Sequence, residues 1–284
     1  MDRRRSGGVG AGELERRGRA PRLRDRALGI AGGLALLCAA ACGDDLAASD
    51  TDAGSASASA SGGSASASGG SDSGSATAGE SCDATGQHAG EATYYDADGS
   101  GNCSFDPTPG DLMVAAINEA DYAGSAPCGA CAEVVGPQGT ITVRIVDRCP
   151  GCAQGDLDLS PQAFEMIAPL VDGRVDIDWR FVPCAVDGPL RYRFKEGSSQ
   201  WWTAVQVRNH RHAIASLEYS VDGGESFVPV ARESYNYFVA PEGMGADPMR
   251  LRVTDVYGHV VVDEGVVVGD ATEVAGAANF PACD

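Results

Sequence analysis

Short apolar runs separated by frequent Gly and Pro residues occupy the chain between positions 88 and 184. This pattern predicts strands at 90–95, 112–117, 132–135, 140–146 and 175–183, and short helices at 118–123 and 160–169. Short strands bounded by turn residues, with only minor helices between them, are typical of a small β-barrel. Trp179 lies within the last of these apolar strands, so we expect it in the barrel core.

A second set of strands follows a short connector at 185–188. The expected strands recur at intervals of about ten residues, at 189–194, 201–208, 214–220, 226–231, 249–254 and 259–263. Even spacing without a helix-length apolar pattern predicts an antiparallel β-sandwich of about one hundred residues. We therefore predict an all-β protein, with a barrel over residues 81–184 and a sandwich over residues 189–284.

The first 80 residues have the composition of an export signal and a linker. Residues 1–41 are basic and then apolar from Ala27, which predicts a signal peptide whose apolar part is too short to span a membrane. Small residues precede Cys42, as in bacterial lipoproteins, and lipidation of Cys42 and ordinary secretion both remain open. Residues 42–80 are rich in Ser, Ala and Gly, which predicts a flexible linker. We expect an extracellular or outer-membrane-anchored protein that contacts a membrane only through a lipid.

The net charge of the chain restricts the classes of molecule that it can bind. The formal net charge is −19, and the basic residues are concentrated at the N-terminus, so the remainder is more acidic still. Such a surface repels phosphate backbones, which argues against nucleic acid as a partner. It also favours neutral over acidic polysaccharides, although the same charge serves general solubility equally well.

Ten cysteines are present, and eight of them follow the signal peptide and Cys42. An even number in an exported chain indicates a disulfide framework. The spacing of Cys128, Cys131, Cys149 and Cys152 also suits a four-thiolate zinc site, but export to an oxidising compartment favours disulfides. A redox role for Cys149 and Cys152 lacks the βαβ context that such a motif needs.

Three polar residues are candidates for chemistry in the first domain. Asp147 follows the expected strand 140–146, Asp158 comes just before a helix-start signal, and Thr93 lies in the first strand. A carboxyl whose pKa is raised can act as a general acid, but glycoside hydrolysis normally needs two carboxylates on opposite sides of the bond. The alternative is that both aspartates cap their loops.

In the second domain Trp201 and Trp202 are adjacent, and successive residues of a strand point to opposite faces. At least one indole is therefore expected at the surface, where flat rings stack on sugars; the alternative is one core and one edge Trp. Lys195, the only lysine of the chain, and Tyr235 extend this surface. His210 and His212 are expected to bond within the sheet, and we predict no metal site and no cofactor.

Several strings of residues together resemble the microbial expansins over residues 88–265. The strings are Gly90-x-Ala-Thr-Tyr94, Val146-Asp147, Gly155-x-Leu-Asp158-Leu-Ser-Pro-x-Ala-Phe164, Trp179-Arg180, Lys195-Glu-Gly-Ser-Ser-x-Trp-Trp202, Val205-Gln-Val-Arg-Asn-His210 and Tyr235-Asn-x-Phe238. The match covers both domains and their order. The run from Lys195 to His210 is long and unusual, which makes the resemblance specific.

The resemblance implies a six-stranded double-psi β-barrel like that of family 45 glycoside hydrolases, followed by an immunoglobulin-like β-sandwich of carbohydrate-binding module family 63. Expansins loosen cell walls without hydrolysing glycan, so it implies a monomeric, non-enzymatic protein that binds cellulose or another neutral β-glucan. The family's groove residues would be Thr93, Asp147 and Asp158, with Asp158 in the place of the hydrolase's general acid. Its aromatic line would be Trp201, Trp202 and Tyr235, with Lys195 beside it.

One departure concerns Cys149, which stands where some bacterial members have a groove tyrosine. By analogy with disulfide-braced relatives we expect Cys103–Cys128 and Cys131–Cys184, which leaves Cys149–Cys152 and Cys82–Cys283 as the remaining pairs. Two other functions stay open: a glycoside hydrolase or lytic transglycosylase with Asp158 as the acid, and an adhesin in which only the sandwich binds.

Overall fold

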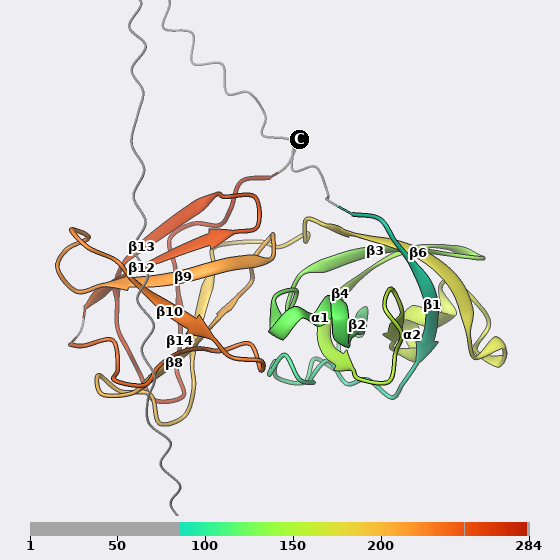
Figure 1. Cartoon of the computed structure of the whole chain (residues 1–284), viewed down its shortest axis with the longest axis horizontal. Helices are drawn as coiled ribbons and strands as arrows, with labels where there is room; N and C mark the ends of the chain where they lie inside the picture. The colour runs from blue at the N-terminus through green and yellow to red at the C-terminus, as the bar shows by residue number, and fades with distance from the viewer. Residues whose placement is uncertain (1–85, 247, 283–284) are drawn as a thin grey trace, which may run out of the picture. The chain divides into compact units, whose positions relative to one another are not determined.

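The computed structural model describes residues 86–246 and 248–282 (Figure 1). These residues belong to one compact unit. The expected signal peptide, linker, lipidated Cys42 and Cys82–Cys283 pair lie outside the described residues. Within the described part, no helix combines the length and the apolar character needed to cross a membrane.

Six strands close into a barrel in the order β1-β5-β2-β4-β3-β6. Their bounds are β1 (His88–Tyr94), β2 (Val114–Asn118), β3 (Cys131–Gly136), β4 (Gly139–Cys149), β5 (Leu157–Leu159) and β6 (Val175–Val182). Strand β2 is buried along its whole length, because it runs between β5 and β4 and its residues are mostly apolar. Trp179 fills the core from β6 with 1 % of its surface exposed, as expected.

Two boundaries of the barrel elements differ from the predicted ones. Strand β4 does not end before Asp147 but continues to Cys149, because Arg148 and Cys149 still pair with β2. The helix expected at 160–169 is only α2 (Pro161–Glu165), capped by the Ser160 hydroxyl. Pro169 disfavours the helical conformation in the residue before it, which explains why the helix does not reach that position.

Three further short helices complete this half. They are α1 (Glu119–Tyr122), η1 (Ala123–Ser125) and η2 (Leu170–Asp172), of which the last two are 3-10 helices. Asn118 caps α1, its side-chain oxygen accepting the backbone N–H of Asp121 at 3.0 Å. The first helix was expected at 118–123, and α1 with η1 covers nearly the same residues.

Eight strands form the second half, hydrogen-bonded in the order β13-β12-β9-β10-β11-β8-β7-β14. Their bounds are β7 (Arg191–Phe194), β8 (Thr203–Arg208), β9 (Ile214–Ser220), β10 (Val228–Arg232), β11 (Phe238–Ala240), β12 (Met249–Asp255), β13 (Val260–Val266) and β14 (Glu273–Ala275). Strand β10 pairs with β9 through its first residues and with β11 through its last two, so it passes from one sheet to the other. Residues of both sheets share one apolar core.

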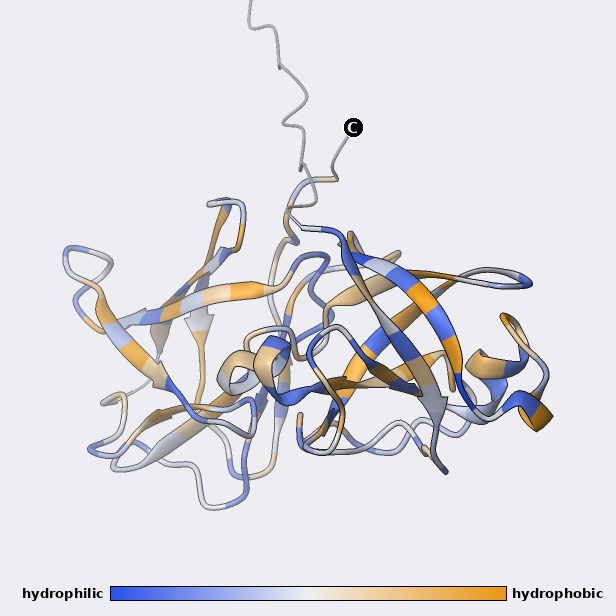
Figure 2. Ribbon diagram, turned by 45° about the vertical axis from the view of Figure 1, so that its right-hand side comes forward, coloured by the Kyte–Doolittle hydropathy of each residue, from blue (hydrophilic) through white to orange (hydrophobic). Residues whose placement is uncertain are grey.

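Hydrophobic and hydrophilic residues alternate along strands of both halves (Figure 2). In β12, for example, buried and partly buried positions alternate along the whole strand. This is the period-two pattern of strands with one face in a core. The prediction of an all-β protein with a six-stranded barrel and a β-sandwich is confirmed.

Three disulfides brace the barrel half. They are Cys103–Cys128, Cys131–Cys184 and Cys149–Cys152, the pairings expected for these six residues. The four cysteines with zinc-like spacing are thus distributed over three separate bonds. A four-thiolate zinc site is therefore incompatible with this arrangement.

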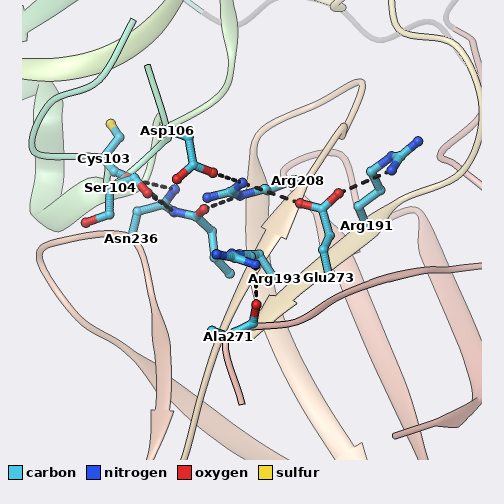
Figure 3. A network of polar contacts seen from close by, with 10 residues as sticks. Cys103, Ser104, Asp106, Arg191, Arg193, Arg208, Asn236, Ala271 and Glu273 are labelled. Carbon is cyan, nitrogen blue, oxygen red and sulfur yellow. Dashed lines mark hydrogen bonds and ion pairs between the residues drawn. The ribbon is translucent and has the colours of Figure 1, made fainter. Parts of the chain in front are cut away.

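Hydrogen bonds join the barrel to the sandwich through the Val205–His210 string (Figure 3). The buried Gln206 amide donates to the Cys103 carbonyl at 2.8 Å. Arg208 pairs with Asp106 at 2.7 Å and also donates to the Gln206 side chain. The Asn236 amide donates to the same Cys103 carbonyl at 3.2 Å. This string, which carries much of the family resemblance, serves to hold the two halves together.

Candidate functional site

The three polar candidates of the barrel lie in one row across four strands. Thr93 of β1 is paired with Asp158 of β5, and Ala116 of β2 is paired with both Asp158 and Asp147. Neighbouring strands are about 4.8 Å apart, so the backbones of Asp147 and Asp158 are about 10 Å apart on either side of Ala116. Asp158 is therefore part of a strand and not, as expected, of the loop before the helix.

The Asp158 carboxyl is partly buried and is hydrogen-bonded to its neighbour in the row. Thr93 donates its hydroxyl proton to Asp158 Oδ1 at 2.6 Å. Burial raises the pKa of Asp158, the hydrogen bond from Thr93 opposes the shift, and the negative charge of Asp147 adds to it. The carboxyl is thus prepared to hold a proton more readily than an exposed aspartate.

Asp147 has a structural task. Its Oδ1 accepts the backbone N–H groups of Asn102 at 2.6 Å and of Arg148 at 2.8 Å. Gly101 makes this possible, because a Cβ there would lie 2.3 Å from the Asp147 carboxyl carbon. These contacts are those of a carboxylate that caps a loop.

Tyr95 lies close to the row of Thr93, Asp158 and Asp147, and it was not among the residues predicted from the sequence. Its hydroxyl oxygen is buried and has no hydrogen-bond partner among the described residues. Burial raises the pKa of Tyr95 well above its usual value, and the charges of Asp147, Asp158 and Asp98 add to this effect. The phenol is therefore a neutral donor among acids. Its position two residues after Thr93 was the available signal, because alternate residues of a strand share a face.

The pKa of Asp158 predicts how stability depends on pH. A carboxyl whose pKa is raised by folding stabilises the protein at a pH below the pKa that it has in the unfolded chain, about 3.9. This contribution is lost as the pH rises through the pKa of the folded protein. We expect Asp158→Asn, which cannot ionise, to melt at a higher temperature than wild type at pH 7, with the difference shrinking towards pH 3.

The measurement is thermal unfolding by circular dichroism at both pH values. Asp98→Asn is the matched comparison, because hydrogen bonds from Ser100 lower the pKa of Asp98 and the sign must be the opposite. A melting difference for Asp158→Asn that grows towards low pH would contradict the assignment.

The tryptophan pair lies in a turn and not on a regular strand. Strand β8 starts only at Thr203, and Trp202 makes an isolated bridge with Ser199. Trp201 is 74 % exposed and Trp202 is partly buried, so one indole is at the surface, as expected, although for a different reason. Gly243 packs below this turn, because a Cβ there would lie 1.9 Å from the Gln200 carbonyl.

Lys195 and Tyr235 are connected through a residue that the sequence reading missed. The Lys195 ammonium lies 5.3 Å from the centre of the Tyr237 ring, and the Tyr235 and Tyr237 rings are 6.0 Å apart. Tyr237 is 6 % exposed, so it supports its two neighbours from below. Phe238 pairs with Val205, and Tyr235 lies in the turn that precedes β11. Tyr235 is therefore beyond Val205, more than about 10 Å along the sheet from Trp202.

Asn102 connects Asp147 with the aromatic surface, which consists of Trp201, Trp202 and Tyr235. The Asn102 backbone N–H is bound by Asp147, and its side-chain amide donates to the Ser234 carbonyl at 2.9 Å. The Tyr122 hydroxyl donates to the same carbonyl at 2.7 Å. Ser234 directly precedes Tyr235, so the barrel row and the end of the aromatic surface meet at Asn102.

Comparisons with known proteins agree with this architecture. A family model described as a lytic transglycolase matches residues 87–179. Expansin-YoaJ of Bacillus subtilis is 42 % identical over 181 residues, which cover 62 % of this chain and 77 % of the relative. Expansin-like protein 5 of Dictyostelium discoideum is 32 % identical over 60 % of this chain and 75 % of the relative.

Solved structures give the same result for the fold. The crystal structure of the Clavibacter michiganensis expansin matches with a TM-score of 0.64 and 34 % identity, over 69 % of this chain and 98 % of that one. A point mutant of that expansin in complex with cellohexaose matches equally well. The fold is that of a double-psi β-barrel followed by a β-sandwich. The chain belongs to the expansin family.

Proposed function

We propose that this expansin binds cellulose and related neutral β-glucans and loosens cell walls by disrupting non-covalent contacts between polysaccharides. Its family membership supports a non-hydrolytic wall-loosening protein over an enzyme. In the complex of the Clavibacter relative the ligand is cellohexaose, a linear glucan fragment. A linear chain of this kind can lie across more than one of the aromatic rings of the sandwich.

The contact at Asn102 is the observation that carries this proposal. It fixes the barrel row next to Tyr235, at one end of the aromatic surface. A glucan that stacks on Trp201, Trp202 and Tyr235 then extends towards Asp158. Lys195, over the Tyr237 ring, offers an ammonium group to the sugar hydroxyls.

The role proposed for the barrel is to grip a chain and not to cleave it. Asp158, with Thr93 and Tyr95, presents hydroxyl and carboxyl groups to the sugar. Asp147 uses one carboxylate oxygen to hold two backbone N–H groups, which suits a brace better than a base that activates water. Tyr95 also supplies an aromatic ring to the groove, which lacks the tyrosine of some bacterial members at Cys149.

We further propose that the protein acts outside the cell, as a monomer. The basic and apolar N-terminus supports export, and Cys42 is the residue that would carry a lipid if the protein is anchored.

The experiment that tests the function combines two measurements on the same sample. Wall strips or cellulose paper under constant load should extend faster with the protein, while a reducing-sugar assay of the bath detects no release above buffer. Release of soluble oligosaccharides from cellulose, chitin or peptidoglycan would instead establish a hydrolase or lytic enzyme. Binding without any extension would indicate an adhesin, in which only the sandwich binds.

A further inference from the structure

Two of the four histidines of the chain point at one carboxylate oxygen, away from the barrel row. The Nδ1 atoms of His212 and His259 each lie 2.7 Å from Asp255 Oδ2. The side chains are 1 %, 9 % and 0 % exposed in the order His212, His259 and Asp255. One nitrogen or oxygen atom from each of the three residues lies within 4.8 Å of the others.

The fold brings these residues together from three strand ends. His212 precedes β9, Asp255 ends β12 and His259 precedes β13. The turn between β12 and β13 is closed by a hydrogen bond from the Asp255 N–H to the His259 carbonyl at 3.0 Å. Histidines at 212 and 259 form no short sequence motif, so the sequence gives no sign of the cluster.

The second oxygen of Asp255 fixes the orientation of the first. Asp255 Oδ1 accepts the backbone N–H groups of Tyr257 at 2.9 Å and of His259 at 2.8 Å. These bonds direct Oδ2 towards both imidazoles. A carboxylate held in this way by a second set of hydrogen bonds is a common support of metal ligands.

The chemistry of the three groups selects a class of ion. Two imidazoles and one carboxylate suit zinc, copper or nickel, whereas calcium and magnesium prefer oxygen ligands alone. Ligand atoms about 2.1 Å from a tetrahedral ion lie about 3.4 Å from one another. Each nitrogen–oxygen separation of 2.7 Å must therefore widen by about 0.7 Å, and the rings must turn so that their lone pairs point at the ion, which takes the place of two imidazole protons.

A neighbouring pocket reaches one of the three residues, His212. It has a volume of about 250 Å³, and His212, Val256 and Tyr257 form part of its wall. The Tyr257 ring stands edge-on to His212 at 5.0 Å. Three protein ligands with one position open to water form the usual arrangement of an accessible zinc site.

We propose that His212, Asp255 and His259 bind one divalent transition-metal ion such as zinc. The ion would join the ends of β9, β12 and β13 and keep one coordination position towards the pocket. This site is separate from the polysaccharide surface proposed above.

The experiment uses the full chain without a polyhistidine tag, after dialysis against a chelator. Titration with zinc chloride by calorimetry should show one ion per chain with a dissociation constant of about 1 µM or below, an affinity of about 8 kcal/mol. His259→Gln and Asp255→Asn should each weaken this affinity about 100-fold. An unchanged affinity in either variant, or no binding by wild type, would overturn the site.

The other imidazole–carboxylate pair on the same pocket gives the matched control. His88 and Asp121 also line the pocket, with His88 Nδ1 3.6 Å from Asp121 Oδ2. His88→Gln should therefore leave zinc affinity within about twofold, and loss of binding in this variant would refute the assignment to the sandwich residues.

A measurement on the wild-type protein covers the case of variants that fail to fold. Zinc should shift the ring signals of His212 and His259 in nuclear magnetic resonance spectra and leave those of His88 and His210 in place. Shifts confined to His88 or His210, or no shifts at all, would contradict the proposal.

Discussion

Asp158→Asn reduces wall extension to less than about a tenth of the wild-type rate while binding to cellulose stays within about twofold. Asparagine keeps the size of the side chain and an oxygen that can accept the Thr93 hydroxyl. It can neither hold a proton nor carry the charge that bonds sugar hydroxyls most strongly. The measurement is creep of loaded wall strips, with a cellulose pull-down on the same preparation.

Asp178→Asn is the control for this experiment. Asp178 is an exposed acid on β6, whose backbone pairs with Ala89 and not with the Asp158 row. Its replacement changes the net charge by the same amount and should leave creep unchanged. Full creep in Asp158→Asn, with intact binding, would contradict a role of Asp158 in wall loosening.

The second large effect concerns binding through Trp201 and Trp202. Each replacement by alanine should weaken cellulose affinity about 10-fold, which corresponds to about 1.4 kcal/mol per ring, and both together about 100-fold. An exposed indole offers a flat apolar face to a sugar ring at little conformational cost. Binding isotherms on crystalline cellulose at low and high salt measure the effect, and salt should have little influence because stacking of an indole on a neutral sugar ring involves no charge.

Val262→Ala serves as the comparison for the two tryptophans. Val262 is an apolar residue that is 45 % exposed on β13, which stands at the end of the strand order away from β8. Its removal should not alter the isotherm. If the double tryptophan variant bound cellulose as wild type does, the aromatic surface would not be the binding site.

Most strands could be predicted because they are apolar or alternating runs bounded by turn residues. The strands that were missed are β5, β11 and β14, which have three residues each and are too short to show any period. Their existence depends on neighbours that the fold supplies. The end of β4 was misplaced for a related reason, since pairing with β2 extends it past a polar residue.

Candidate site residues could be selected only where residue type alone indicated chemistry. Asp158, Thr93 and the tryptophans were selected in this way, with help from the family resemblance. The sequence could not show that Asp147 holds the Asn102 backbone, or that Tyr95 lies among three acids, because both depend on distances between separate strands. Lys195 and Tyr235 were selected, but the buried Tyr237 between them was not, since burial removes it from any list of surface residues.

Gly243 has a consequence for how the binding surface is maintained. The main chain at Gln200 and Trp201 rests directly on this residue, with no space for even one additional carbon atom. The height at which the Trp201 indole stands above the sheet is thus set by a buried position. A methyl group at 243 would act as a spacer under the aromatic turn, so the affinity that we propose for a flat crystalline surface would depend on a residue hidden beneath the proposed contact.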